Sequence, residues 1–388
     1  MHVRRASAAL RLLAALLALS LAGCSKKSDG AASPGAVKVG LVTDVGGRGD
    51  QSFNDAGLRG LEQWAAGRKY ATGGYAPLSP EERAASIPEA LRAHVGGTLD
   101  VTPVVLQAKQ QEDYGPNLEL LVEDGVKLAI GVGFMLENAV ESTAKKHPAA
   151  SFLLIDSPIL DAKGTPTSLP NVRTVTFREH EGSFLAGALA GLVTKSGVVG
   201  FVGGMQIPLI RKFEAGFRAG LRTTNPEAEK ALLVAYTGSF DKVEAGKQVA
   251  QDMLLKKADV LFHAAGGDGL GVIAAVKEAG AWAIGCDSDQ HHVAPDHVLT
   301  SMLKRVDLAV YLAVKDVAEG KFTAGHSELG LKDGAVDIAP VRSARLPDRD
   351  ALLEKVDALK QQIVEGGIEV PATLEALAKY QPPQTAAK

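Results

Sequence analysis

The sequence predicts an α/β protein built from two doubly wound lobes, each with a parallel sheet at its centre. From Val37 onward, short β-branched runs alternate with amphipathic stretches, which is the pattern of strands joined by helical crossovers. Ten such runs occur, and ten strands are many for one sheet, so two sheets are expected. A chain of 388 residues, 46% of them hydrophobic, is long and apolar enough to form two cores.

The first residues are typical of an export signal followed by a lipid attachment site. In Met1–Gly23, basic residues precede an apolar run that is too short to span a bilayer. The run ends in LAGC, which has the form of a lipobox in which Cys24 takes the lipid. Residues 24–36 are expected to be a flexible tether. The alternative is a short N-terminal anchor helix. We expect a cell-envelope protein, lipid-anchored to a bacterial membrane and facing the periplasm or the exterior.

Composition excludes several classes of protein. Once the signal is removed, 39 basic side chains face 45 acidic ones, and no basic tract is present, so nucleic acid is not expected as a partner. Two cysteines rule out a disulfide-dense scaffold, and acylation of Cys24 would leave Cys286 without a partner. After the signal, the sequence contains no uncharged apolar run of about 18 residues that would predict a transmembrane helix.

The predicted strands are short and mostly apolar, as strands covered by helices on both faces must be. In chain order they are Val37–Val42, Val101–Leu106, Lys127–Gly131, Ser151–Ile155, Val172–Phe177, Val198–Val202, Ala231–Tyr236, Asp259–Phe262, Ala281–Gly285 and Val298–Leu303.

The stretches between these strands carry apolar residues at helical spacing. They predict helices at Asn54–Gly67, Asn117–Asp124, Leu136–Lys146, Glu181–Thr194, Arg211–Thr223, Lys242–Lys256, Leu270–Ala279 and Val306–Glu319. Two tail helices, at about Asp350–Glu365 and Ala372–Tyr380, are expected to pack on a lobe rather than form a separate module.

Function is expected in the loops that follow the strands, because doubly wound sheets bind ligands beyond the carboxyl ends of their strands. These loops carry glycines, which let the backbone approach a ligand, or polar side chains that can point at one. The informative segments are Thr43–Asn54, Val132–Phe134, Asp156–Pro158, Gly203–Met205, Ala264–Gly269, Asp287–Gln290, and Lys304 at the end of the last strand.

Together these segments resemble the BMP (basic membrane protein) family of lipoproteins. Members are substrate-binding proteins of ABC importers, and characterised members bind purine nucleosides. The resemblance implies a type I periplasmic-binding-protein fold, in which two lobes joined by a hinge close over the ligand. The matching stretches occur in the family's order, between about Val37 and Pro340, at Val39–Asn54, Gly131–Phe134, Glu179–Gly191, Gly200–Gly220, Gly266–Gly271 and Ile284–Lys304.

The lobes of such a protein are discontinuous in sequence. Residues 37–157 with 290–322 are expected to form lobe 1, and residues 158–289 with 323–388 to form lobe 2. The segment 68–102 is longer than its counterpart in the family, and a helix is expected within it at Pro80–Ala93.

The first candidate ligand residues follow from the chemistry of a nucleoside. A nucleoside has a flat apolar base and a ribose with vicinal hydroxyls, so its binding favours aromatic faces and carboxylates. Phe53 and Phe134 are the stacking candidates, with core packing as the alternative. Asp44 follows the first strand and is expected to bind ligand, although an Asp there also caps helices or stabilises turns. Asn54 offers a donor and an acceptor to a base edge, or caps the following helix.

Further candidates follow later strands. Asp156 is either a ligand carboxylate or a hydrogen-bonding residue of the hinge. Asp287 is expected to accept from ribose hydroxyls and Lys304 to donate to the ligand, with a structural ion pair between them as the alternative. Met205 is a soft contact for the base or core filler. Gly267 brings backbone N–H groups near the ligand or makes a plain turn.

Asp268 is the last candidate, and it departs from the family pattern. Family members usually carry a small or hydroxyl residue at this position. An added carboxylate would repel anions and could bind extra hydroxyls or amines, which bears on the identity of the ligand.

No cofactor, metal or bond-making chemistry is expected. His291, His292 and His297 with Asp296 resemble a metal site, but adjacent histidines on a strand or turn point apart. The segment Gly267–Gly271 lacks the spacing of a dinucleotide-binding loop. The sequence contains no nucleophile elbow, Walker motif or zinc-protease motif.

The sequence features and the resemblance to the BMP family together imply a lipid-anchored monomer that binds a purine nucleoside or close analogue between its lobes and delivers it to ABC permease subunits. One alternative is the same fold binding a sugar or another small solute. Another is a secreted nucleoside-processing enzyme, which would need a carboxylate cluster for a metal or a paired acid and nucleophile. A DNA-binding regulator of this architecture would need a helix-turn-helix headpiece where this chain has its export signal.

Overall fold

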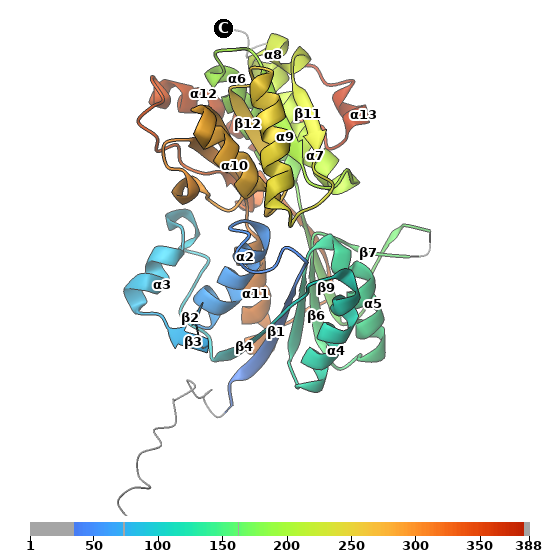
Figure 1. Ribbon diagram of the computed structural model, residues 1–388. Coiled ribbons are helices and arrows are strands. Elements are labelled where there is room, and N and C mark those ends of the chain that lie inside the picture. The colour runs from blue at the N-terminus through green and yellow to red at the C-terminus, as the bar shows by residue number, and fades with distance from the viewer. Residues whose placement is uncertain (1–34, 73, 162, 384–388) are drawn as a thin grey trace, which may run out of the picture.

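The computed structural model describes residues 35–72, 74–161 and 163–383, which form two α/β lobes stacked end to end (Figure 1). The predicted signal sequence, Cys24 and most of the predicted tether lie outside the described residues. Within the described part of the chain, every helix is too short or too polar to cross a membrane. All ten predicted strands are present, and their ends lie within two residues of the predicted ones.

Lobe 1 is built on a six-stranded parallel sheet in the order β15-β9-β6-β5-β1-β4. Alternate residues of each strand face opposite sides, so Val42 packs with α4 and α5 while Leu41 packs with α2 and α11. The strands are β1 (Val37–Thr43), β4 (Val101–Gln107), β5 (Leu128–Val132), β6 (Ser151–Ile155), β9 (Val172–Phe177) and β15 (Gly325–Leu329). The helices are α2 (Phe53–Leu58), α4 (Tyr114–Glu123), α5 (Glu137–Lys146) and α11 (Val306–Ala318).

Lobe 2 repeats this plan with the sheet order β11-β10-β12-β13-β14-β16, in which only β16 is antiparallel. Helices α9 and α10 cover one face, and α6 and α7 cover the other (Figure 1). The strands are β10 (Val199–Gly203), β11 (Leu233–Tyr236), β12 (Val260–Ala264), β13 (Trp282–Asp287), β14 (Val298–Lys304) and β16 (Val336–Ile338). The helices are α6 (Glu179–Val193), α7 (Pro208–Thr224), α8 (Pro226–Lys230), α9 (Val243–Leu255), α10 (Asp268–Ala279) and α12 (Arg349–Val364).

The chain crosses between the lobes three times, each time later than expected. Strand β9 belongs to lobe 1, although the prediction starts lobe 2 at residue 158. Strand β14 belongs to lobe 2, although residues 290–322 are predicted in lobe 1, and β15 pairs with β9 in lobe 1 rather than joining lobe 2. The crossings follow β9, β14 and β15 because each strand first completes a sheet. An apolar run predicts a strand but not which of two sheets it joins.

The segment 68–102 forms a small subdomain on lobe 1. It contains the hairpin β2–β3 (Arg68–Ala71 and Gly74–Pro77), which was not predicted, and helix α3 (Pro80–Ser86). The helix is shorter than the predicted Pro80–Ala93 because Pro88 disfavours helical backbone at the residue before it. The guanidinium of Arg83 donates to the carbonyls of Trp64 and Gly96, which fastens the subdomain to lobe 1.

The predicted helix Asn54–Gly67 changes type along its length. It begins as α2 and continues as a π-helix, η1 (Arg59–Ala65). Gly60 lies against the backbone of α11, and a Cβ there would come within 2.3 Å of the carbonyl oxygen of Asp307. This close approach packs η1 tightly against α11.

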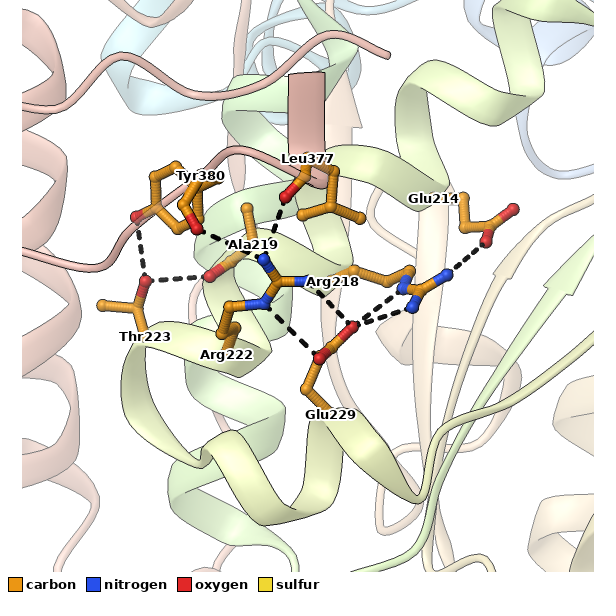
Figure 2. A network of polar contacts seen from close by, with 8 residues as sticks. All are labelled: Glu214, Arg218, Ala219, Arg222, Thr223, Glu229, Leu377 and Tyr380. Carbon is orange, nitrogen blue, oxygen red and sulfur yellow. Dashed lines mark hydrogen bonds and ion pairs between the residues drawn. The ribbon is translucent and has the colours of Figure 1, made fainter. Parts of the chain in front are cut away.

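The C-terminal segment is fastened to lobe 2 by a polar network around α7 (Figure 2). Arg222 donates through Nη1 to the carbonyl oxygens of Leu377 (2.9 Å) and Tyr380 (3.3 Å). Its Nη2 and Arg218 both pair with Glu229. Helix α13 (Leu374–Leu377) is shorter than the predicted Ala372–Tyr380.

Candidate functional site

A cavity of about 520 Å³, in part open to solvent, lies between the lobes where the carboxyl ends of the two sheets face each other. Strands β1, β5 and β6 of lobe 1 and β12, β13 and β14 of lobe 2 all end at this cavity. Seven of the predicted site residues line it, namely Asp44, Phe53, Asn54, Phe134, Asp156, Asp287 and Lys304.

The loop after β1 is held in shape by its own carboxylates. Asp50, which the sequence analysis did not single out, accepts hydrogen bonds from the backbone N–H groups of Ser52, Asn54 and Asp55 and so caps α2. The side-chain amide of Asn54 donates to Asp44 Oδ1 (2.7 Å) and Asp50 Oδ2 (3.0 Å), and its oxygen accepts from the backbone N–H of Asp44. Asn54 therefore positions the two carboxylates.

One carboxylate oxygen of Asp44 is free to accept a hydrogen bond from a ligand in the cavity. Its Oδ1 accepts from Asn54 and from the backbone N–H of Gly46, whereas Oδ2 makes no hydrogen bond to any described residue. Burial raises the pKa of Asp44 to about 6, against the lowering effect of the Asn54 hydrogen bond. Burial likewise raises the pKa of Asp50 to about 7, and the nearby Asp55 adds to the shift.

Lys304 is the centre of a buried charge cluster. Its ammonium lies 2.5 Å from Asp156 Oδ2 and 3.2 Å from Glu179 Oε1, and its side chain is 2% exposed. Glu179 begins α6, and its other oxygen lies 3.1 Å from the ammonium of Lys212. The alternative considered for Asp287 and Lys304 was a structural ion pair between them, but the described carboxylates that pair with Lys304 are those of Asp156 and Glu179.

The cluster sets the protonation of its members. Burial alone would lower the pKa of Lys304, but the carboxylates of Asp156, Glu179 and Asp287 outweigh it and raise that pKa above its ordinary value. Burial raises the pKa of Asp156 to about 7, although the ammonium of Lys304 lowers it. Burial alone would raise the pKa of Glu179, but the ammonium groups of Lys304 and Lys212 outweigh burial and lower that pKa below its ordinary value. Lys304 therefore stays charged.

Asp287 joins the lobes directly. Its Oδ2 accepts a hydrogen bond from the hydroxyl of Ser52 in lobe 1 (2.7 Å), and that hydroxyl also lies 3.0 Å from the carbonyl oxygen of Cys286. Burial raises the pKa of Asp287, against the neighbouring Lys304. This contact closes the cavity on the side of the β1–α2 loop.

Aromatic rings from both lobes meet across the cavity. Phe134 follows β5 and Gly133, and it lies edge-to-face with Phe240 of lobe 2 at a centroid distance of 6.3 Å. Phe53 and Phe213 each place a ring near the ammonium of Lys304, at 5.0 and 5.6 Å from their centroids. The two phenylalanines predicted as stacking residues thus both line the cavity, and Phe53 also packs against the core.

Three predicted site residues do not line the cavity. Asp268 accepts hydrogen bonds from the hydroxyl of Ser239 and the backbone N–H of Lys242, so its carboxylate stabilises a loop of lobe 2 instead of facing a ligand. Gly267 lies behind Gly266, which is the glycine of this loop that reaches the cavity. Met205 lies in the loop after β10, outside the lining.

Several residues that line the cavity were not predicted from the sequence. Phe240 lies in the loop after β11, and the rule that selected the other loops also applies to this one. Phe213, Leu209 and Ile210 belong to α7, where apolar residues at helical spacing are typical of a core-facing helix and give no separate signal. Asp50 lies within the segment Thr43–Asn54 that was singled out, but it was not chosen as a candidate ligand residue.

No group of three or more His, Cys, Asp or Glu side chains that could hold a metal ion occurs among the residues placed by the structure. His292 contacts Gln51, and His297 contacts the carbonyl of Ala281.

Two doubly wound lobes, three crossings between them, and a polar and aromatic cavity between facing strand ends define a periplasmic-binding-type solute-binding protein. Family comparison makes this specific. Residues 37–374 match the family model Bmp, described as ABC transporter substrate-binding protein PnrA-like, and the chain belongs to this family. The family resemblance and the fold class predicted from the sequence are both confirmed.

Relatives and solved structures agree with this assignment. The chain is 30% identical over 374 residues to the ABC transporter nucleoside-binding protein BmpA of Lactococcus lactis, with 91% of this chain and 95% of that protein covered. It is 34% identical over 365 residues to the CD4+ T-cell-stimulating antigen of Listeria innocua, covering 89% and 91%. An ABC transporter solute-binding protein structure from Aeropyrum pernix matches with a TM-score of 0.69 at 28% identity, covering 88% and 96%. The family comprises solute-binding proteins of ABC transporters, not enzymes.

Proposed function

We propose that this substrate-binding protein binds a purine nucleoside or a close analogue in the cavity between its lobes, and that a lipid on Cys24 holds it at the membrane, where it delivers the ligand to a permease. The observation that carries the proposal is a buried carboxylate oxygen, Asp156 Oδ1, which has no hydrogen-bond partner among the described residues and belongs to a cavity that also presents aromatic rings. A buried acceptor of this kind calls for a donor from the ligand.

The carboxylate end of the cavity suits a ribose. Asp156, Asp287 and Asp44 can accept hydrogen bonds from hydroxyl groups, and charge-assisted hydrogen bonds of this kind are the stronger ones. Lys304 remains charged and can donate to a ribose oxygen while holding the carboxylates together. Because carboxylates outnumber cations here, the site favours a neutral donor over an anion.

The aromatic end suits a flat base. Phe134 comes from lobe 1 and Phe240 from lobe 2, so a base in contact with both rings would touch both lobes. Ligand contacts that exist only when the lobes are together shift the population toward the closed form. The ligand would leave chemically unchanged.

The sugar-binding alternative has lost its support. It rested on Asp268 as an extra carboxylate in the site and on the long 68–102 segment. Asp268 binds the loop after β11 instead, and the segment 68–102 contributes no residue to the cavity lining.

Calorimetry of the protein lacking its first 24 residues tests the ligand class. We expect saturable binding of inosine, guanosine or adenosine that tenfold excess ribose does not displace. The variants Asp156→Asn and Phe240→Ala should each weaken binding by about tenfold or more, since each removes a charged acceptor or an aromatic face. Asp252→Asn, which removes an exposed carboxylate on α9, is the matched control. Binding of ribose alone, or of no nucleoside, would refute the ligand class.

The anchor is tested separately. Cells expressing the full chain and supplied with an alkyne-tagged fatty acid should label it, and Cys24→Ser should abolish labelling and release the protein from membranes. Labelling that survives this substitution would contradict the anchor but not the ligand class.

A further inference from the structure

A second cleft lies at the seam between the lobes, behind the proposed nucleoside cavity. It encloses about 980 Å³ of space continuous with solvent. Lobe 1 contributes Arg48 and Arg59 together with residues of the 68–102 segment, and lobe 2 contributes Asp289 and His292. Arg305 reaches the cleft from the crossing between β14 and α11.

The two cavities share their walls. Lys304 lines the nucleoside cavity while the next residue, Arg305, lines the second cleft, as expected where neighbouring side chains of an extended segment point to opposite sides. At the end of β13, Asp287 likewise lines the nucleoside cavity and the next residue, Ser288, lines the second cleft. Because residues of both lobes line each cavity, a movement that separates the lobes changes the linings of both.

The carboxylates of the second cleft are already satisfied. Asp55, Glu62 and Asp289 each have hydrogen-bond partners on both oxygens, drawn from backbone N–H groups, arginines and a tyrosine hydroxyl. They have little capacity left for a cationic ligand, and their charges are largely offset by the groups that bind them.

Two arginines of the cleft, Arg305 and Arg59, keep guanidinium donors that have no partner among the described residues. The guanidinium of Arg305 is partly buried, yet it makes no hydrogen bond or ion pair with any residue in the described part of the chain. Arg59 uses Nε and Nη2 to bind Asp307 and Ser288, which leaves Nη1 without a partner among the described residues. The free charged groups that line this cleft are therefore guanidinium donors.

We propose that the second cleft binds a small oxyanion, through a phosphate or carboxylate group held by Arg305 and Arg59. Guanidinium groups match the geometry of both groups and stay charged at all relevant pH values. Arg59 belongs to lobe 1, and it already donates to Ser288 in lobe 2. An anion held between Arg59 and the crossing residue Arg305 therefore stabilises the closed arrangement and couples to the nucleoside cavity.

Titration of the ligand-free protein with inorganic phosphate, against chloride at equal ionic strength, tests the site without any nucleoside. Phosphate should bind saturably and raise the unfolding temperature. Arg305→Gln should weaken this binding about tenfold or more, and Arg305→Lys should restore part of it. Arg349→Gln, which removes an exposed arginine on α12, should leave it unchanged. A parallel titration with citrate, which carries carboxylate groups, distinguishes the two kinds of anion. Binding of only phosphate or only citrate identifies the group that the cleft prefers.

The coupling has its own test. Linkage requires that phosphate tighten nucleoside binding by the same factor by which nucleoside tightens phosphate binding, and Arg305→Gln should abolish both effects. No saturable binding of either anion, or equal binding by Arg305→Gln, would overturn the site. Anion binding that leaves nucleoside affinity unchanged would overturn the coupling. Failure of the nucleoside proposal would leave the phosphate titration intact.

Discussion

Two aspartates at strand ends adopt backbone conformations that are uncommon for residues with a side chain. Asp156 has φ of +72° and Asp287 has φ of +64°, both in the left-handed region. Aspartate and asparagine tolerate this region better than other non-glycine residues, and such conformations concentrate at functional sites. The turns end β6 and β13 at the seam between the lobes and bring both carboxylates to the cavity.

The protonation of these carboxylates predicts a pH dependence of ligand binding. The pKa of Asp44 is about 6 and that of Asp156 is about 7, both raised mainly by burial. A ligand that donates hydrogen bonds prefers the ionised forms, so nucleoside affinity should fall as the pH drops from 8 to 5.5. Calorimetry across this range measures the effect. Asp156→Asn should show a flatter profile, and a pH-independent affinity of the unmodified protein would contradict the prediction.

Lys304 is predicted to be a stabilising residue as well as a ligand contact. In Lys304→Met, Asp156 loses its direct partner, and we expect the free energy of unfolding to fall by about 3 kcal/mol at pH 8. Without the ammonium, the pKa of Asp156 in the folded state rises further above its unfolded value, so protonation relieves the penalty. Denaturant unfolding should therefore show a smaller loss at pH 5.5 than at pH 8. A loss that grows toward low pH would exclude this explanation.

At the scale of elements, helices α6 and α7 pack together through glycines. A Cβ at Gly220 would lie 1.9 Å from the carbonyl oxygen of Phe184, and one at Gly187 would lie 2.0 Å from that of Phe217. This proximity matters for the site because α6 begins with Glu179 and α7 carries Phe213 near its N-terminal end. The spacing of the two helices therefore sets the position of the cluster around Lys304.

Gly220→Ala is predicted to force these helices apart. The methyl group meets backbone, which cannot rotate away, so we expect a loss of about 2–3 kcal/mol in the free energy of unfolding. Gly97→Ala is the control, because a Cβ at Gly97 has nothing within 4 Å and should change stability by less than about 1 kcal/mol. Equal effects of the two substitutions in denaturant unfolding would show that the close approach is not responsible.

The strands could be predicted from the sequence more completely than the lobes. All ten strands predicted from apolar runs bounded by turn residues are present in the structure, because strands buried on both faces leave a local signal in the sequence. The assignment of β9, β14 and β15 to their sheets depends on pairing between distant segments, which no local pattern encodes. Strand β15 has the polar sequence GHSEL and lies at a sheet edge, so it carries almost no apolar signal.

The site was predictable where it follows strand ends. Asp44, Asp156 and Lys304 directly follow or end strands, and the structure brings them to one cavity. Phe213 escaped prediction because a helical residue near a helix start looks the same whether it faces a core or a cavity. Asp268 was misplaced because the direction of its side chain depends on Ser239, in a loop 29 residues away.

At the scale of the whole molecule, the C-terminal segment stabilises lobe 2 far from the cavity. Arg222 and Thr223 hold this segment at the C-terminal end of α7 (Figure 2). Ile210 and Phe213 line the cavity at the other end of the same helix. A substitution that weakens the attachment of the tail should therefore leave the affinity for the ligand unchanged.

Arg222→Met is predicted to loosen the tail without disturbing the ligand. It removes the donors to Leu377 and Tyr380, so we expect faster proteolysis of the C-terminal segment and a loss of about 1–3 kcal/mol in stability. Nucleoside affinity should stay within about twofold, since the cavity is several helical turns away. Arg218→Met is the matched control, because Arg218 pairs with Glu214 and Glu229 but not with the tail. Equal proteolysis of the two variants would contradict this role for Arg222.

The two ends of the described chain belong to different lobes. Strand β1 begins at the end of lobe 1 that lies farthest from lobe 2, whereas α13 packs against lobe 2 (Figure 1). Fluorescent proteins fused just before β1 and just after α13 would therefore be attached to different lobes. Energy transfer between them would change when the lobes move relative to each other, so the protein could serve as an optical biosensor for its own solute.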